Sequence, residues 1–321
     1  MAVLESLRGA AALVHQTVQP TLQHSWPLLN ARAGTEVWVK HENHTPIGAF
    51  KLRGGLVYMD RLREREPDVT GVISATRGNH GQSVAFAARH CGLSATIVVP
   101  EGNSSEKNAA MQALGAELIE NGHDFQAAYE FTLAEAERRA LHLVPSFHDD
   151  LVSGVASYSL ELFDAVDDID TFYVPIGLGS GICGAIRARD ALGFKTKIVG
   201  VVSEKAATYA LSFEAGEAIA TNSADTMADG VACRVPNDDA LAIIRRGAER
   251  IITVSDNAIM AAMRDLASDT HNMAEGAGAV ALAGLMSESD GMRGKRVAIV
   301  LSGGNIDRAL YLKALSGEAD A

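Results

Sequence analysis

The chain has 321 residues, of which 47% are hydrophobic and 21% are charged, the composition of a globular protein with one large domain or two of ordinary size. Its formal net charge of −12 disfavours nucleic acid and anionic membranes as partners, because both require a basic surface. The three cysteines, Cys91, Cys183 and Cys233, lie far apart, which fits a reducing compartment and no structural metal. Because no apolar run approaches membrane-span length and no signal-peptide pattern is present, we expect a cytoplasmic protein with no membrane partner.

Apolar, β-branched runs alternate with alanine-rich segments, which predicts parallel sheets covered by helices on both faces. After an amphipathic helix over residues 1–16, strands are expected at residues 37–40, 72–74, 96–100, 172–175, 198–202, 251–254 and 297–301. Helices are expected at residues 82–90, 105–114, 125–141, 152–165, 184–192, 257–267 and 275–286. We expect one sheet within residues 72–145 and another within residues 172–301. Ligands of such folds gather at the carboxyl ends of the strands.

A single lysine, Lys51, stands out because small and apolar residues precede it, and Arg53 and two glycines follow it. Such neighbours can hold an amine away from water, and desolvation lowers the pKa of a lysine enough to make it a nucleophile or a base. Taken alone, the stretch is equally compatible with a surface lysine beside a turn. Its role therefore depends on what the rest of the chain supplies.

The residues Thr76-Arg77-Gly78-Asn79-His80 follow the strand at 72–74, and a helix is expected to begin at about Gln82. A strand-to-helix turn with glycines offers backbone N–H groups and a helix N-terminus to an anion. The amide of Asn79 can also donate a hydrogen bond to an oxygen. The same residues are compatible with a plain connection that binds nothing.

A second glycine-rich turn, Gly177-Leu178-Gly179-Ser180-Gly181, follows the strand at 172–175 and precedes an alanine-rich helix. Its backbone amides can close around a phosphate with help from the helix dipole. Gly179, Gly181 and Gly184 also match the G-x-G-x-x-G pattern, and Glu204 follows about twenty residues later. A nicotinamide or flavin oxidoreductase is therefore an alternative, although it leaves the Lys51 stretch and the Asn79 turn unexplained.

Three further turns carry candidate residues. Asp229 lies in a turn with a glycine, and Glu275 opens an alanine-rich helix. Ser302 follows the strand at 297–301 and offers a hydroxyl beside glycines that let a ring approach closely. A reactive lysine, a phosphate cradle, a second anion site and a hydroxyl together suit a phosphorylated aldehyde cofactor that forms a Schiff base with the lysine.

With these motifs, the chain resembles the pyridoxal-phosphate (PLP) enzymes of the tryptophan-synthase-like type, fold type II, in their serine/threonine dehydratase branch. Six motifs occur in the family's order and cover nearly the whole chain: residues 49–54, 78–82, 174–181, 228–232, 274–275 and 302–305. The resemblance implies an α/β fold of two parallel-sheet domains with the cofactor in the cleft between them. It also implies a large cofactor-binding domain of residues 1–51 and 149–321, a small domain of residues 52–148, and a homodimer.

The resemblance implies a role for each candidate residue. Lys51 would form the Schiff base with PLP and later remove the Cα proton of the substrate, while Phe50 would pack near the cofactor ring. Asn79 would bond the 3-hydroxyl of the cofactor, Ser302 would meet its pyridine nitrogen, and Glu275 would lie beside it. The loop Gly177-Leu178-Gly179-Ser180-Gly181 would hold the phosphate. The loop Thr76-Arg77-Gly78-Asn79-His80 would receive the substrate carboxylate.

A serine at the pyridine nitrogen, where an aspartate would hold a pyridinium, makes the ring a weaker electron sink and favours loss of a β-leaving group over transamination. The resemblance therefore implies a dehydratase, or ammonia-lyase, that converts a small-molecule 3-hydroxy amino acid into a 2-oxo acid and ammonia. Serine and threonine are the default substrates, and 3-hydroxyaspartate or phenylserine are further candidates. A racemase or a β-replacement enzyme is the alternative within PLP chemistry.

The chain departs from its relatives at several positions. Arg77 stands where similar dehydratases carry a small residue and serine racemases carry a serine, which disfavours racemisation by that route. Its guanidinium could bind a second carboxylate on the substrate or pair with a nearby acid. Val202 and Thr208 stand where some relatives have ligands for a divalent cation, so no metal is expected. The chain ends soon after Asn305, so we expect an unregulated, catabolic enzyme.

Overall fold

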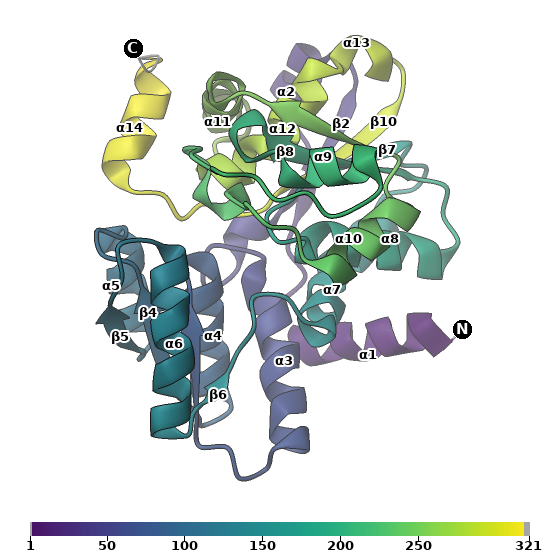
Figure 1. Cartoon of the computed structure of the whole chain (residues 1–321). Helices are drawn as coiled ribbons and strands as arrows, with labels where there is room; N and C mark the ends of the chain where they lie inside the picture. The colour runs from purple at the N-terminus through teal and green to yellow at the C-terminus, as the bar shows by residue number, and fades with distance from the viewer. Residues whose placement is uncertain (1, 318–321) are drawn as a thin grey trace.

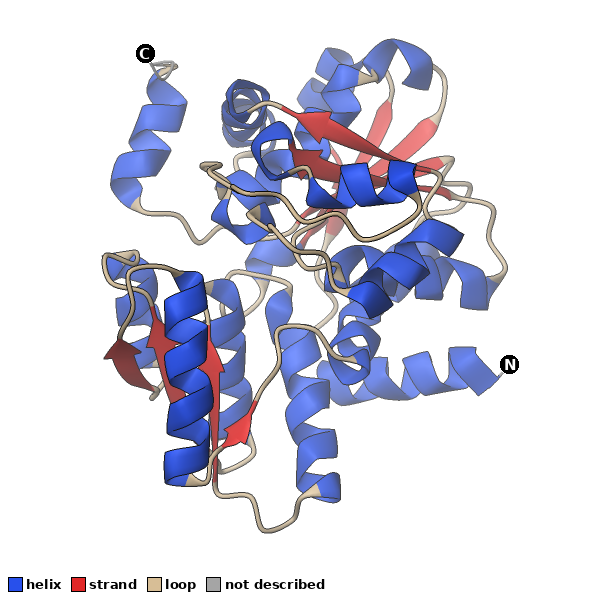
Figure 2. Cartoon of the chain, in the orientation of Figure 1, coloured by secondary structure: helices blue, strands red, loops and turns tan. Residues whose placement is uncertain are grey.

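The computed structural model describes residues 2–317, which form two mostly parallel sheets surrounded by helices (Figure 1 and Figure 2). The larger sheet draws its strands from both ends of the sequence. In spatial order they are β1 (Gln23–Ser25), β2 (Glu36–His41), β10 (Arg296–Leu301), β7 (Thr171–Pro175), β8 (Lys197–Ser203) and β9 (Arg250–Val254). Strand β1 runs antiparallel to β2, and the other neighbouring strands run parallel.

The smaller sheet comes from the middle of the sequence and forms the lower part of the molecule in Figure 1. Its parallel strands, in spatial order, are β5 (Glu117–Glu120), β4 (Ser94–Val99), β3 (Gly71–Ala75) and β6 (His142–Leu143). The predicted α/β class and the two separate sheets are therefore confirmed. The division into a large domain of residues 1–51 and 149–321 and a small domain of residues 52–148 stays a prediction, which this distribution of strands supports.

The helices surround both sheets. They are α1 (Ala2–His15), α2 (Pro27–Ala33), α3 (Lys51–Arg65), α4 (Asn79–His90), α5 (Ser105–Ala113), α6 (Phe125–Arg139), α7 (Asp149–Ala165), α8 (Ser180–Leu192), α9 (Thr208–Ala215), α10 (Asp238–Gly247), α11 (Asp256–Thr270), α12 (Gly276–Ser287), α13 (Ser289–Met292) and α14 (Arg308–Ser316). Short 3₁₀ turns lie at η1 (Glu42–His44), η2 (Glu204–Ala206) and η3 (Asp229–Val231).

The central strands of the larger sheet, β7, β8 and β10, are largely apolar because both faces of the sheet are buried. Along β10, Val297 and Ile299 point to a core formed with α2, α11 and α12, whereas Ala298 and Val300 point to a core formed with α1, α7, α8 and α10. Successive side chains of a strand face opposite sides, so a sheet covered twice needs apolar residues at every position. The smaller sheet is likewise covered by α3 and α4 on one face and by α6 on the other.

Helix α3, which begins at Lys51, is absent from the elements that the sequence predicts, because its second turn contains Gly54 and Gly55, which are poor helix formers. The structure explains both glycines by close packing. A Cβ atom at Gly54 would lie 2.8 Å from the Leu151 carbonyl oxygen of α7, and one at Gly55 would lie 2.3 Å from the Ser83 hydroxyl oxygen of α4. Helix α3 therefore packs tightly against helices from both sheets.

A buried ion network fixes the start of α3. The guanidinium of Arg53 is fully buried and contacts the carboxylates of Glu42, at 2.6 Å, and Glu161, at 2.5 Å. The amine of Lys40 also contacts Glu161, at 2.6 Å. Each buried charge thus has an opposite partner, as burial of charged groups requires. The network joins α3 to η1, β2 and α7 immediately beside Lys51.

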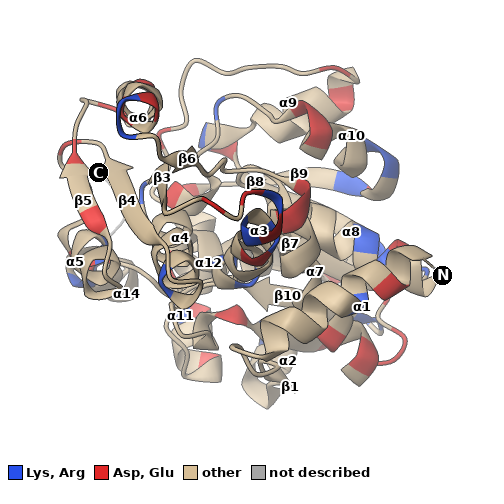
Figure 3. Cartoon of the chain, turned by 90° about the horizontal axis from the view of Figure 1, so that it is seen from below, with Lys and Arg blue, Asp and Glu red and all other residues tan. Residues whose placement is uncertain are grey.

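Charged residues lie mainly on the outside of the molecule. Figure 3 shows acidic and basic positions together on outer helices such as α6. Within residues 2–317, no helix is both long enough and apolar enough to cross a membrane.

Candidate functional site

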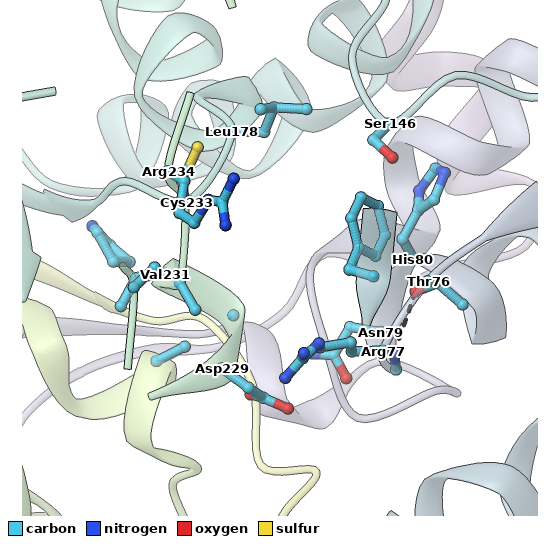
Figure 4. A pocket seen from close by; sticks show the side chains of 18 of the residues that line it. Thr76, Arg77, Asn79, His80, Ser146, Leu178, Asp229, Val231, Cys233 and Arg234 are labelled. Carbon is cyan, nitrogen blue, oxygen red and sulfur yellow. Dashed lines mark hydrogen bonds between the residues drawn. The ribbon is translucent and has the colours of Figure 1, made fainter. Parts of the chain in front are cut away.

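A cavity of about 620 Å³ lies where the two sheets face each other, at the carboxyl ends of β3, β7 and β10. All fourteen residues to which the family resemblance gives a role line it: Phe50, Lys51, Thr76, Arg77, Gly78, Asn79, His80, Gly177, Leu178, Gly179, Ser180, Gly181, Glu275 and Ser302. Figure 4 shows several of them around the open space. The structure therefore brings together residues as far apart in the sequence as Phe50 and Ser302, which are 252 positions apart.

Lys51 is the first residue of α3, and its side-chain nitrogen lies 3.3 Å from the Ser180 hydroxyl oxygen. The same nitrogen lies 5.2 Å from the centre of the Phe50 ring. Burial lowers the pKa of Lys51 to about 8, so about a tenth of the amine is neutral at pH 7, far more than for a solvated lysine. The preceding loop is anchored by the backbone, because the Phe50 N–H donates to the Ser302 carbonyl oxygen at 3.0 Å. The lysine and the Ser302 turn are thus held side by side.

The glycine loop of residues 177–181 forms the N-terminus of α8. The sequence predicts this helix from residue 184, but it begins at Ser180, directly after Gly179 in a left-handed conformation with φ 107°. No side chain caps the helix, so its first amides are available to an anion. The hydroxyl of Tyr209 donates to the Leu178 carbonyl oxygen at 2.8 Å and that of Tyr158 to the Gly181 carbonyl oxygen at 3.2 Å. These two hydrogen bonds fix the backbone of the loop. No pattern in the sequence indicated this role for the tyrosines.

The turn of residues 76–80 leads into α4, which begins at Asn79 and not at the predicted Gln82. The Thr76 hydroxyl oxygen accepts hydrogen bonds from the Gly78 N–H, at 3.0 Å, and the Gly81 N–H, at 3.3 Å, so this side chain shapes the turn. His80 is partly buried, and its Nε2 atom has no hydrogen-bond partner. Burial, assisted by the charge of Lys51, lowers the pKa of His80 to about 3, so its imidazole is neutral.

Asn79 connects three parts of the site. Its Nδ2 donates to a carboxylate oxygen of Glu275 at 2.6 Å, and its Oδ1 accepts from the Asn305 side chain at 2.8 Å. Asn305 also donates to the Ile47 carbonyl oxygen at 2.7 Å. The orientation of the Asn79 amide is therefore set by the Lys51 loop on one side and by the start of α12 on the other.

Lys107 is a cavity residue that the sequence did not indicate. It belongs to α5, is largely buried, and forms an ion pair with Asp229 of η3. An isolated lysine within an ordinary helical pattern carries no signal of such a position. Arg234 also lines the cavity, and Figure 4 shows its side chain and that of Arg77 on different walls.

The dinucleotide-binding pattern has a different explanation in the structure. Gly184 lies inside α8, where an added Cβ atom would come within 3.0 Å of the Ala156 backbone nitrogen of α7. This glycine is therefore needed for close helix packing. Glu204, the acidic residue of the pattern, is exposed at η2 and is not among the cavity-lining residues of the described chain. Within residues 2–317, no group of three or more His, Cys, Asp or Glu residues could hold a metal ion.

Comparisons with known proteins agree with this geometry. A family model described as pyridoxal-phosphate dependent enzyme matches residues 14–303. The L-threonine ammonia-lyase of Thermotoga maritima is 33% identical over 96% of this chain and 76% of its own length. The L-threo-3-hydroxyaspartate ammonia-lyase of Saccharomyces cerevisiae is 32% identical over 91% of this chain and 90% of its own.

Solved structures with a similar fold include a threonine deaminase and a serine racemase. The processed threonine deaminase isoform 2 of Solanum lycopersicum superposes with a TM-score of 0.92 at 29% identity, over 98% of this chain and 93% of that one. Maize serine racemase superposes with a TM-score of 0.91 at 28% identity, over 98% of this chain and 96% of that one.

Proposed function

Because the chain belongs to the family of pyridoxal-phosphate dependent enzymes, we propose that it is an ammonia-lyase acting on a 3-hydroxy amino acid of the serine or threonine type. The family and the relatives confirm the predicted cofactor, PLP, and the predicted dehydratase class. One observation carries the assignment to this cavity: the partly neutral amine of Lys51 lies beside the open N-terminus of α8.

The residues of the cavity fit PLP. The uncapped amides of residues 177–181 suit a phosphate, the Lys51 amine suits an aldehyde, and the Ser302 hydroxyl lines the same cavity at the end of β10. When bound, the cofactor withdraws electrons from the Cα atom of the substrate and so makes its proton acidic. The fit depends on backbone amides, so Leu178 and Ser180 can stand where relatives have glycine.

The protein's own residues supply the remaining chemistry. The Lys51 nitrogen holds the cofactor and then accepts the Cα proton, which it can do because its pKa of about 8 leaves part of the amine neutral. The amides of the turn at residues 76–80 bind the substrate carboxylate at the N-terminus of α4. Ser302 offers an uncharged hydroxyl to the ring nitrogen, which favours departure of the β-hydroxyl over amino transfer.

The test is a panel of 3-hydroxy amino acids offered to the PLP-loaded enzyme, with ammonia and 2-oxo acid as products. We expect both products in equal amounts from at least one substrate. Chiral analysis of the residual substrate separates the racemase alternative, and added thiols or other nucleophiles separate β-replacement. Inversion or replacement without ammonia release would overturn the proposal.

The side chain that the enzyme prefers is a finer proposal, and Arg77 supports an acidic one. Its exposed side chain lines the cavity and forms no ion pair within residues 2–317, so the pairing with a nearby acid that the sequence left open is not made. Arg234 is a second exposed guanidinium on the cavity wall. A guanidinium binds a carboxylate through two hydrogen bonds. The S. cerevisiae relative is named for L-threo-3-hydroxyaspartate, a substrate with such a carboxylate.

The variant Arg77→Ala tests this preference. We expect it to lower kcat/KM for 3-hydroxyaspartate about tenfold or more, the cost of a lost charge-assisted hydrogen bond, and to leave serine within a few-fold. Both 3-hydroxyaspartate diastereomers should be compared with serine, threonine and phenylserine. Equal loss for all substrates would refute an acidic side-chain site and leave the ammonia-lyase assignment standing.

We also propose a homodimer in the cytoplasm. The family resemblance supports the dimer, and the exposed apolar side chains of Leu22, Leu28 and Met273 offer surface for a contact. The free thiols of Cys91, Cys183 and Cys233 support a reducing compartment. Light scattering of the purified enzyme measures the oligomeric state directly, and a monomer at micromolar concentration would contradict the dimer.

A further inference from the structure

Glu275 is an unusual carboxylate because its ionisable side chain is almost fully buried. Only 2% of its surface is exposed, at the N-cap position of α12. One carboxylate oxygen accepts from Asn79 Nδ2 at 2.6 Å, but the other, Oε2, has no hydrogen-bond partner among the described residues. The cation that approaches Oε2 is the Lys107 amine, at 3.8 Å. A buried carboxylate with one free oxygen depends strongly on such a charge.

Lys107 reaches Glu275 from the other side of the cavity. It is on α5, which packs with the smaller sheet, whereas Glu275 and Asp229 belong to α12 and η3 beside the larger sheet. The Lys107 amine pairs with Asp229 and faces Glu275, so one buried amine serves two carboxylates. Its stem lies against the turn before α4, because a Cβ atom at Gly78 would come 2.7 Å from Lys107 Cδ.

The first turn of α5 has further contacts with the last segment of the described chain. The Ser104 hydroxyl donates to the Asp307 carboxylate, and the Arg308 N–H donates to the Glu106 carboxylate at 3.1 Å. These two contacts are at the surface, whereas Lys107 is buried at the cavity wall. Lys107 is therefore the member of this turn that can act on the site.

We propose that Lys107 is a positioning residue of the reaction, which favours the ionised form of Glu275 so that this carboxylate fixes the Asn79 amide toward the cofactor. The role in the reaction rests on the proposed function, but the charge coupling does not. Without the ammonium of Lys107, Glu275 would take up a proton at higher pH. The hydrogen bond from Asn79 to Glu275 would then have a neutral acceptor and lose its charge assistance.

The charged groups around Glu275 determine the direction in which its pKa shifts when one of them is removed. Burial, with the charge of Asp229, outweighs the opposing charge of Lys107 and the hydrogen bond from Asn79 and raises the pKa of Glu275 to about 7. Burial alone would lower the pKa of Lys107, but the charges of Glu275 and Asp229 outweigh it and raise that pKa. The groups facing Glu275 are Lys107 from α5, Asp229 from η3 and the neutral Asn79 from α4. Removal of Lys107 must therefore raise the Glu275 pKa, and removal of Asp229 must lower it.

The experiment is a pH titration of the visible absorbance of the PLP-loaded enzyme without substrate, so its outcome does not depend on which reaction the enzyme catalyses. We expect a step near pH 7 in the wild type that disappears in Glu275→Gln. In Lys107→Met the step moves up by about one to three units, and in Asp229→Asn it moves down. Lys107→Arg keeps it near its original position. The exposed Lys195 provides the control variant Lys195→Met, which should titrate as the wild type.

The double variant Lys107→Met/Glu275→Gln separates a specific coupling from a general loss of structure. We expect Lys107→Met to reduce kcat at pH 7 about tenfold and to recover at higher pH, and to cost little more in the Glu275→Gln background. An unchanged step in folded, PLP-loaded Lys107→Met, or an equal loss in both backgrounds, would overturn the proposal. If Lys107→Met does not bind PLP, the Asp229→Asn variant provides the test. An absorbance step that moves to higher pH, or that does not move, would overturn the proposal.

Discussion

The side-chain nitrogen of Lys51 lies 3.3 Å from the hydroxyl oxygen of Ser180, although 129 positions separate the two residues in the sequence. Lys51 begins α3 and Ser180 begins α8, so two helix N-termini converge on the same part of the cavity. The amine that can react with an aldehyde therefore lies next to the amides that can hold a phosphate. This adjacency explains why a phosphorylated aldehyde fits here.

The variant Lys51→Ala should abolish the reaction. Without the amine, the enzyme has neither its attachment to PLP nor its base for the Cα proton, so we expect kcat to fall roughly 10²–10⁴-fold or more. Ammonia release measures the rate. Borohydride reduction followed by peptide mass spectrometry should place the cofactor on residue 51 in the wild type and nowhere in the variant. Lys195→Ala, at an exposed lysine, is the matched control. Wild-type turnover by Lys51→Ala would refute the role of this lysine.

The strands and the turns that follow them show how much of the fold and of the site could be predicted from the sequence. Every predicted strand is present, because a strand buried on both faces contains a continuous apolar run, such as residues 297–301 of β10, and is easily recognised. The candidate residues lie in one cavity because turns after parallel strands meet at the same edge of a sheet. The edge strands β1, β5 and β6 were missed, since short, half-exposed segments such as Glu117–Glu120 have no clear apolar pattern.

Other features depended on tertiary contacts that a local pattern does not contain. The sequence predicts no helix at α3 and starts α8 at residue 184 instead of Ser180, because glycines such as Gly54 and Gly181 are poor helix formers. The structure shows that Gly54 lies where α3 packs too closely against α7 for a side chain. Tyr209 and Lys107 have roles that arise only when distant segments meet. No spacing in the sequence distinguishes them from other tyrosines and lysines.

The buried network around Arg53 should dominate the stability of the α3 start. In Arg53→Ala, Glu42 and Glu161 lose their common partner inside the protein, so we expect a loss of about 3–5 kcal/mol in the free energy of unfolding. Urea denaturation followed by circular dichroism measures this change. Arg61→Ala is the control on the same helix, because its pair with Asp150 is partly exposed and should cost about 1 kcal/mol or less. Similar losses for both variants would show that burial of the network is unimportant.

PLP binding by the loop of residues 177–181 should depend on the backbone conformation of the loop. Only some of its glycines should therefore need to lack a side chain. A Cβ atom at Gly177 would lie 2.2 Å from the Gly230 carbonyl oxygen, so Gly177→Ala must move the loop. At an overpacking cost of about 1–3 kcal/mol, PLP affinity should fall about tenfold or more. At Gly181 the nearest atom, the Tyr158 hydroxyl oxygen, lies 3.5 Å away, so Gly181→Ala should stay within about threefold of the wild type. Titration of the apoenzyme with PLP gives both affinities, and the reverse order would contradict a cradle built from backbone amides.

The rate at which the apoenzyme binds PLP should depend on the protonation state of the Lys51 amine. Only the neutral amine attacks an aldehyde, and burial lowers the pKa of Lys51 from 10.5 to about 8, so the rate of capture should rise with pH and level off above about 8. Between about pH 8 and 10.5 the unfolded chain binds a proton that the folded apoenzyme does not, so the stability of the wild type should rise with pH relative to Lys51→Met across this window. Stopped-flow absorbance measures the capture rate, and urea denaturation of both apoenzymes measures the stability difference. A capture rate that keeps rising to pH 10, with no stability difference between the two apoenzymes, would mean that the Lys51 amine is solvated like a surface lysine.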